Sequence, residues 1–148
     1  MALFIRFFVV IFGLFFAALA AGAVLVFATL PPDTFDAPFD RVDWLILWGS
    51  ILTSAAIVSA IAFVPAVVVI LIAEALAFRS LFFYALAGGI GGLAYGLTFP
   101  AAAVANTLDR TTEITLAAGA AAGIAYWLVA GRTAGLWRGN SVQSADYI

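Results

Sequence analysis

Few side chains in this chain could take part in chemistry. Its charged residues are six arginines and eight carboxylates, and it contains no His, Cys or Lys. Haem ligation uses His or Met, zinc sites use His and Cys, and Schiff-base chemistry needs Lys. The one methionine is Met1, and we find no phosphate loop, no nucleophile with a base partner and no basic nucleic-acid surface. We expect a chain with no catalytic residue, no metal site and no nucleic-acid partner.

Glu74 is the carboxylate that could lie at membrane depth, because it follows a long apolar stretch. An ionisable residue inside a membrane is by default a candidate functional residue. A helix from Trp44 to Glu74 would be about 45 Å long at 1.5 Å per residue, against a hydrocarbon core of about 30 Å. Glu74 is therefore expected in the headgroup layer, where an ion pair with Arg79 would fix a turn. A buried Glu74 with a proton-coupled or gating role is the alternative.

The composition is that of an integral membrane protein. Apolar residues make up 66% of the chain and charged residues 9%, whereas soluble domains carry roughly 25% charged residues. Four apolar stretches approach or exceed the roughly 20 residues that a membrane-spanning helix needs. The sequence predicts an all-α four-helix bundle in one transmembrane domain, residues 1–131, followed by a short cytoplasmic tail, residues 132–148. The expected helices cover about 4–30, 44–74, 81–105 and 112–131.

Helix ends and bends are also predicted. Pro31 and Pro32 should end the first helix, and Asp43 is expected to cap the second. Pro65 should bend the second helix, as Pro100 should bend the third.

The arginines predict the orientation of the chain. Arg41 and Arg110 fall in the two connections on one side of the predicted bundle. With four spans, the other side receives the remaining four arginines: Arg6, Arg79, Arg132 and Arg138. Because cytoplasmic segments carry an excess of Lys and Arg, both termini are expected in the cytoplasm.

Glycines mark a helix-packing face on the third span. Gly88, Gly92 and Gly96 recur every four residues and so share one helical face, and the fourth span offers Gly119 and Gly123. In lipid, such small residues let helix backbones approach closely. We expect the third and fourth helices to pack as a tight hairpin, with self-association through this glycine zipper as the alternative.

Phenylalanines mark a second face, on the first span. Phe4, Phe8, Phe12 and Phe15 follow helical spacing. Contact with lipid is the simplest interpretation. The sharper alternative is a docking face for a larger membrane complex, or for an apolar lipid, quinone or carotenoid.

Several segments carry a resemblance to a known group. The chain resembles small four-span membrane proteins of alphaproteobacteria in the run from Phe63 to Ala66, in Ala73-Glu74-Ala75, in Arg79-Ser80-Leu81, in Tyr84 with Gly88-Gly89, and in the segment from Tyr126 to Arg132. The resemblance implies a multi-pass protein of the bacterial cytoplasmic (inner) membrane. It implies no particular activity.

The sequence thus favours a non-catalytic accessory or structural subunit that packs against a larger membrane complex. Its expected partners are membrane lipids and other membrane protein subunits, or a second copy of itself. A small oligomeric channel or transporter is the alternative, with a polar face at Ser50, Thr53 and Ser54. A lipid-binding or quinone-binding membrane protein is a further alternative.

Overall fold

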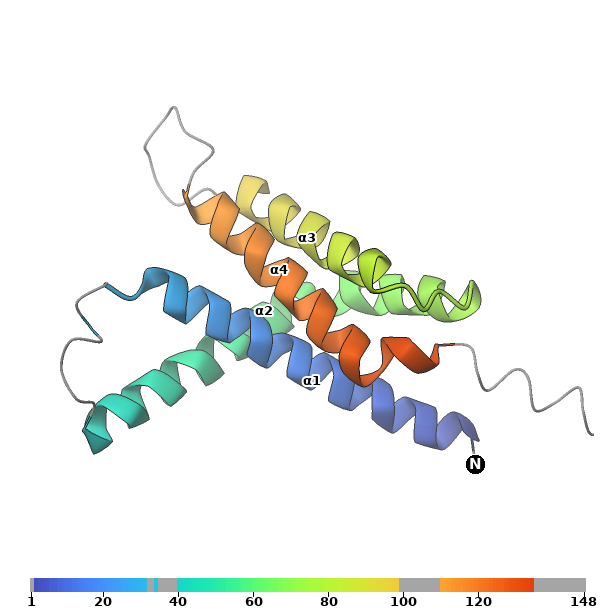
Figure 1. Cartoon of the computed structure of the whole chain (residues 1–148), viewed down its shortest axis with the longest axis horizontal. Helices are drawn as coiled ribbons and strands as arrows, with labels where there is room; N and C mark the ends of the chain where they lie inside the picture. Colours follow the sequence, from blue (N-terminus) through green and yellow to red (C-terminus); the bar gives the residue numbers. More distant parts are fainter. Residues whose placement is uncertain (1, 32–33, 35–39, 99–109, 135–148) are drawn as a thin grey trace, which may run out of the picture.

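A computed structural model of the chain contains four long helices and a short helical turn (Figure 1). They are α1 (Ala2–Thr29), α2 (Arg41–Ala75), α3 (Leu81–Thr98), α4 (Arg110–Val129) and the 3-10 helix η2 (Gly131–Thr133). The structure describes residues 2–31, 34, 40–98 and 110–134. All four α-helices are long and apolar enough to cross a membrane, which confirms the all-α prediction with four candidate spans.

The start of α2 differs from the expected one. Asp40 is the N-cap, and its Oδ1 accepts hydrogen bonds from the backbone N–H groups of Val42 and Asp43 at 2.7 and 2.9 Å. The Asp43 carboxylate in turn accepts from the Asp40 N–H at 3.0 Å. The prediction that Asp43 is the cap was therefore wrong. Asp40 is the cap and Asp43 is the third residue of the helix, and together they form a reciprocal capping box that satisfies three backbone donors. The predicted end of the third helix near residue 105, Pro100 and most of the predicted tail lie outside the described residues.

The closest helix packing joins α3 to α4, which lie side by side (Figure 1). A Cβ atom at Gly88 would meet the carbonyl oxygen of Gly119, and one at Gly119 would meet that of Gly88. Likewise, a Cβ at Gly92 would meet the carbonyl oxygen of Thr115, and one at Gly123 that of Tyr84. The expected tight hairpin is present. A second copy cannot use this glycine face unless α3 and α4 separate.

The helix α1 bridges α4 and α2. Gly13 packs against the ring of Tyr126 and the methyl group of Ala130, both on the α4 side. Gly22 packs against the carbonyl oxygen of Ile51 and against Ala55 of α2. Small residues on α1 therefore bring both neighbours close, by the same physical means that join α3 to α4.

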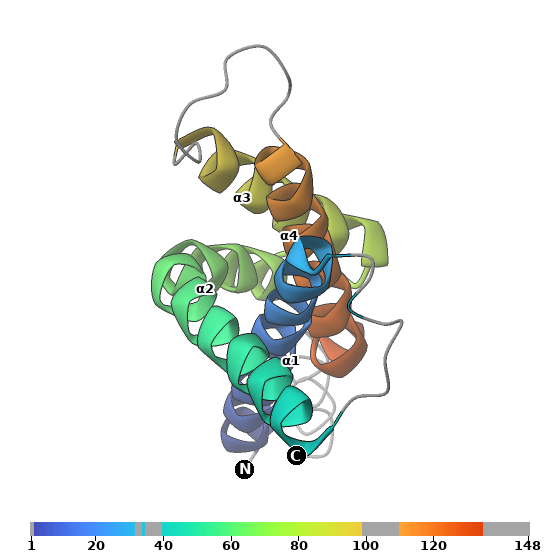
Figure 2. The ribbon, with the colours of Figure 1, turned by 90° about the vertical axis from the view of Figure 1, so that its left-hand side faces the viewer.

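The helix α2 is unusually long and is only partly covered. Its 35 residues span about 52 Å along the helix, well beyond a hydrocarbon core of about 30 Å. Pro65 lies inside it, and Figure 2 shows the helix changing direction along its length. Its buried residues are Leu47, Ile51, Ala55, Ile70 and Ala73. The stretch between them, residues 56–69, therefore has no buried residue.

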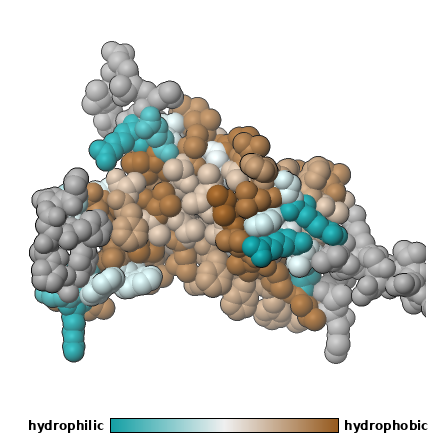
Figure 3. All heavy atoms as spheres, in the orientation of Figure 1, coloured by the Kyte–Doolittle hydropathy of each residue, from teal (hydrophilic) through white to brown (hydrophobic). Residues whose placement is uncertain are grey.

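The face of the molecule seen in Figure 3 is largely apolar, and large apolar side chains are exposed on all four helices. The four phenylalanines of the predicted α1 face are all more than half exposed: Phe4, Phe8, Phe12 and Phe15. In a membrane this surface contacts lipid tails or other proteins instead of water. Its exposure is therefore not unfavourable.

The α3–α4 contact can be tested by adding one carbon atom. We expect Gly92→Ala to destabilise the protein by roughly 1–3 kcal/mol, because the new methyl group meets the Thr115 carbonyl and the backbones must move apart. The measurement is the midpoint of thermal unfolding in a mild detergent. Gly91→Ala is the matched control, since nothing lies within 4 Å of a Cβ at that neighbouring position. Equal midpoints for the two variants would contradict the close contact.

Candidate functional site

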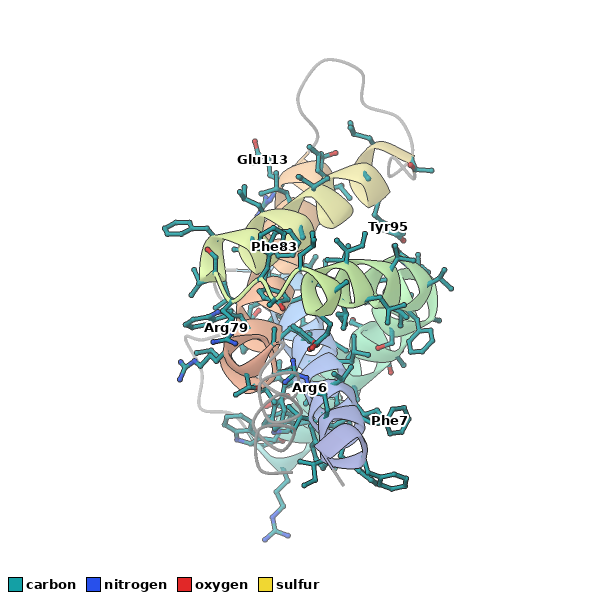
Figure 4. All side chains as sticks on the ribbon, turned by 90° about the vertical axis from the view of Figure 1, so that its right-hand side faces the viewer. Arg6, Phe7, Arg79, Phe83, Tyr95 and Glu113 are labelled. Carbon is teal, nitrogen blue, oxygen red and sulfur yellow. The ribbon has the colours of Figure 1, made fainter. Side chains whose placement is uncertain are left out.

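Polar side chains from separate helices meet at one end of the bundle, on the right in Figure 1. This end holds the start of α1, the connection between α2 and α3, and η2 after α4. We call it the arginine end and define it by Arg6, Glu74, Arg79, Arg132 and Thr133. Figure 4 views the molecule from this side, with Arg6 and Arg79 labelled.

An ion pair between α1 and α2 lies at the centre of the arginine end. Glu74 Oε1 accepts a hydrogen bond from Arg6 Nε at 2.8 Å and another from Arg6 Nη2. The two side chains are only 12% and 16% exposed. Arg6 Nη1 also donates to Thr133 Oγ1 at 2.6 Å. One guanidinium thus connects α1, α2 and η2 through charge-assisted hydrogen bonds, which are stronger than neutral ones.

The partner predicted for Glu74 is therefore corrected from Arg79 to Arg6. Arg79 is the cation nearest to Glu74 in the sequence, but the packing of α1 brings a guanidinium from 68 positions away. The Arg79 side chain points elsewhere, and its Nε donates to the carbonyl oxygen of Ala134 at 2.9 Å. One signal could have identified the pair: the arginine distribution already placed Arg6 on the same side as Glu74.

The turn after Glu74 is closed by a Schellman motif. The N–H of Phe78 donates to the Ala73 carbonyl at 2.9 Å, and the N–H of Ala77 donates to the Glu74 carbonyl at 3.3 Å. Ala77 has a φ of 53°, in the left-handed region where glycine is usual. An alanine here costs of order 1–2 kcal/mol, which the rest of the turn must offset. The turn ends α2 at Ala75 and lets α3 start at Leu81.

Two tyrosines with their rings in tilted contact lie inside the arginine end. The rings of Tyr84 and Tyr126 are 5.4 Å apart and belong to a buried cluster that includes Ala73 and Ala130. The Tyr84 hydroxyl donates to the Phe78 carbonyl at 3.2 Å, which supports the turn. The Tyr126 hydroxyl is the one buried polar side-chain atom of the described residues that has no hydrogen-bond partner. Leaving a hydroxyl buried in this way costs on the order of 1–3 kcal/mol.

An indole organises the outer part of the site. Trp127 Nε1 donates to the carbonyl oxygen of Arg79 at 2.7 Å. The Arg132 guanidinium lies over the same ring, 4.6 Å from its centroid, in a cation–π contact. Both arginine residues are exposed. No pattern in the sequence pointed to this role of Trp127, because its hydrogen bond depends on a turn that is 48 positions away.

The other predicted site residues lie away from the arginine end or serve the fold. The five glycines, Gly88, Gly92, Gly96, Gly119 and Gly123, lie in the contact between α3 and α4. The Ser50 hydroxyl donates to the Ile46 carbonyl at 2.8 Å, within its own helix. The described residues contain no group of His, Cys, Asp or Glu side chains that could hold a metal ion.

Comparison with known proteins identifies no relative: no protein-family model, no curated protein and no solved structure matches the chain. The class is defined by the fold alone. This is a multi-pass membrane protein by the length and composition of its four helices.

The corrected ion pair makes a sharp prediction. We expect Glu74→Gln to destabilise the protein by roughly 1–3 kcal/mol, because it leaves the partly buried Arg6 without its counter-ion. Arg6→Gln should have a similar effect. The double variant should lose less free energy of unfolding than the sum of the losses in the two single variants. The measurement is a double-mutant cycle on unfolding midpoints in detergent. A parallel cycle of Glu74→Gln with Arg79→Gln is the control. A larger coupling energy between Glu74 and Arg79 than between Glu74 and Arg6 would favour the pair predicted from the sequence.

Proposed function

We propose that this chain is a non-catalytic accessory or structural subunit that packs laterally against another protein in the membrane. The observation that carries the proposal is the middle of α2. Residues 56–69 make about four turns of helix in which no residue is buried. The other three helices pack through small residues that bring backbones together, whereas this part of α2 is at most half-buried.

A hollow beside this stretch supports a protein neighbour. It has a volume of about 250 Å³ and lies between α1 and α2, where Ala18, Ala55, Ala56 and Ser59 form part of its wall. In membranes, small residues at a helix surface favour close approach of another helix. Ala56 and Ser59 are exposed at the surface of this chain. A side chain of a neighbouring helix would fill the hollow and gain dispersion contacts there.

The phenylalanine face of α1 gives the proposed interaction a second surface. Phe15 lines the same hollow, and Phe12 and Phe8 continue along α1 toward the arginine end. Aromatic rings offer large contact areas to a protein partner. A protein that covers the middle of α2 could extend over this face without crossing α3 or α4.

A small channel or transporter is the second candidate, favoured by the Arg6–Glu74 pair, since ionisable residues within membrane segments often mark ion or proton pathways. The hydroxyls of Ser50 and Thr98 favour this candidate less, because each donates to a carbonyl of its own helix. Reconstituted vesicles that show flux of ions or protons, abolished by Glu74→Gln, would support this candidate over the accessory role.

We further propose that the arginine end faces the cytoplasm of a bacterium and that the protein resides in the inner membrane. Arg79 and Arg132 lie at this end together with Arg6, whereas Arg41 and Arg110 begin α2 and α4 at the other. Cytoplasmic flanks carry the excess of arginine. A reporter active only in the cytoplasm should be active after residue 148 and inactive when inserted between residues 34 and 40. The reverse activities would overturn the orientation.

The lateral contact can be tested by photocrosslinking in native membranes. A photoreactive phenylalanine analogue at Ser59 should give an adduct with another membrane protein, because Ser59 borders the hollow. The same analogue at Ile57 is the matched control: it lies at nearly the same depth, on about the opposite face of α2, and is also exposed. Mass spectrometry of the adduct identifies the partner.

The outcomes separate the possibilities. One defined partner at position 59, absent at position 57 and recovered with the protein after mild detergent extraction, supports the accessory role. An adduct with a second copy would make the chain a homo-oligomer and contradict that role. Equal, diffuse labelling from both positions would mean that lipid covers both faces and would also contradict it.

A further inference from the structure

We propose that Arg79, Trp127 and Arg132 form a binding site for the phosphate of an anionic phospholipid. The site would lie beside the Arg6–Glu74 pair, at the surface of the arginine end. It is separate from the lateral contact proposed above, and its test does not depend on that contact.

Arg79 is held in place at two points. Its carbonyl oxygen accepts from Trp127 Nε1 at 2.7 Å, and its Nε donates to the Ala134 carbonyl at 2.9 Å. With Nε occupied, the two terminal amino groups of the guanidinium are the donors left for a ligand. The residue itself is exposed. Arg79 thus presents oriented donors at the surface, with less side-chain freedom to lose on binding.

Arg132 is held by the same tryptophan. Its guanidinium lies 4.6 Å from the centroid of the Trp127 ring, and no hydrogen bond of Arg132 to a described residue competes for its donors. Arg132 also lies two residues before Ala134, whose carbonyl binds Arg79. The indole therefore contacts both arginine residues, the backbone carbonyl of Arg79 at its edge and the Arg132 guanidinium over its face. Because the Arg79 side chain binds the Ala134 carbonyl, two residues after Arg132, the fold itself holds both cations at this end.

The charge of this pair is not balanced within the described part of the chain. Glu74, the carboxylate of the arginine end, is engaged by Arg6. The carboxylates at Asp40, Asp43 and Glu113 lie in the first turns of α2 and α4 or before them, at the other end of the bundle. Two guanidinium groups without a carboxylate favour an anion with several acceptor oxygens. Phosphate has that chemistry, and arginine binds it through paired N–H donors.

The position of the site identifies the source of the phosphate. Arg79 follows the last turn of α2, and Arg132 follows α4, so both lie at the ends of candidate membrane spans, where lipid headgroups are found. An apolar groove of about 510 Å³ between α1, α2 and α4 begins at the other end of the bundle, beside Phe27 and Trp44, and extends along α4 to Leu128 and Val129, within one turn of Arg132. Figure 3 shows hydrophilic side chains directly beside hydrophobic ones at this end. A phospholipid satisfies both features, with its phosphate at the arginines and an acyl chain along the apolar surface.

The test compares lipids on the purified full chain. Delipidated protein in mild detergent should bind phosphatidylglycerol and gain thermal stability, while phosphatidylcholine should give neither effect at the same concentration. Arg79→Gln combined with Arg132→Gln should weaken phosphatidylglycerol binding tenfold or more, measured by native mass spectrometry. The matched control is Arg41→Gln combined with Arg110→Gln, which removes the same charge from the opposite end of the bundle.

Two outcomes would overturn the site. The first is an equal loss of phosphatidylglycerol binding in the two double variants, which would mean diffuse attraction by net charge. The second is binding that neither double variant changes. Inorganic phosphate that stabilises the protein as well as phosphatidylglycerol would overturn the lipid as the ligand. If the double variant fails to fold, the single variant Arg132→Gln tests the site. This substitution removes only a surface cation–π contact and no hydrogen bond, so the fold should tolerate it. A loss of threefold or more in that variant supports the site, and unchanged binding overturns it.

Discussion

A guanidinium and a carboxylate at the edge of a bilayer are costly to leave apart, because little water is available to solvate either one. Arg6 and Glu74 meet that constraint by binding each other, and the way they do so determines the arrangement of the arginine end. The pair holds the start of α1 against the last turn of α2, and the third donor of Arg6 reaches Thr133 after α4. The pair thus adds a polar connection between helices that already pack through Gly13 and Gly22.

Away from this end, contact between helices follows a different rule. Lipid tails solvate apolar side chains as well as a neighbouring helix does, so helices associate where small residues let backbones meet. Gly88 and Gly119 do this for α3 and α4, and Gly13 and Gly22 do it for α1. The same rule makes the middle of α2 conspicuous, because Ala56 and Ser59 are small residues that stay exposed beside the hollow between α1 and α2. The internal and the proposed external contacts thus share one physical basis.

Features that depend on local periodicity could be predicted from the sequence, and features that depend on neighbours could not. The four spans and the glycine face follow from the length of apolar runs and a spacing of four residues. The partner of Glu74 depends on which helix packs beside α2, so proximity in sequence pointed to Arg79 and missed Arg6. The left-handed Ala77 carried no signal, because glycine usually marks that position. The role of Trp127 was equally hidden, since its acceptor belongs to a distant turn.

The reach of Arg6 along the chain also has a consequence for biogenesis. Its carboxylate partner lies 68 positions further on, and its hydroxyl partner 127 positions further on. During synthesis from the amino terminus, α1 enters the membrane well before either partner exists. The guanidinium must therefore wait among lipid headgroups until α2 arrives, and the last of its bonds can form only after α4 has been inserted. The closed arginine end, with all three donors of Arg6 engaged, can therefore exist only in a chain whose last helix is already in place.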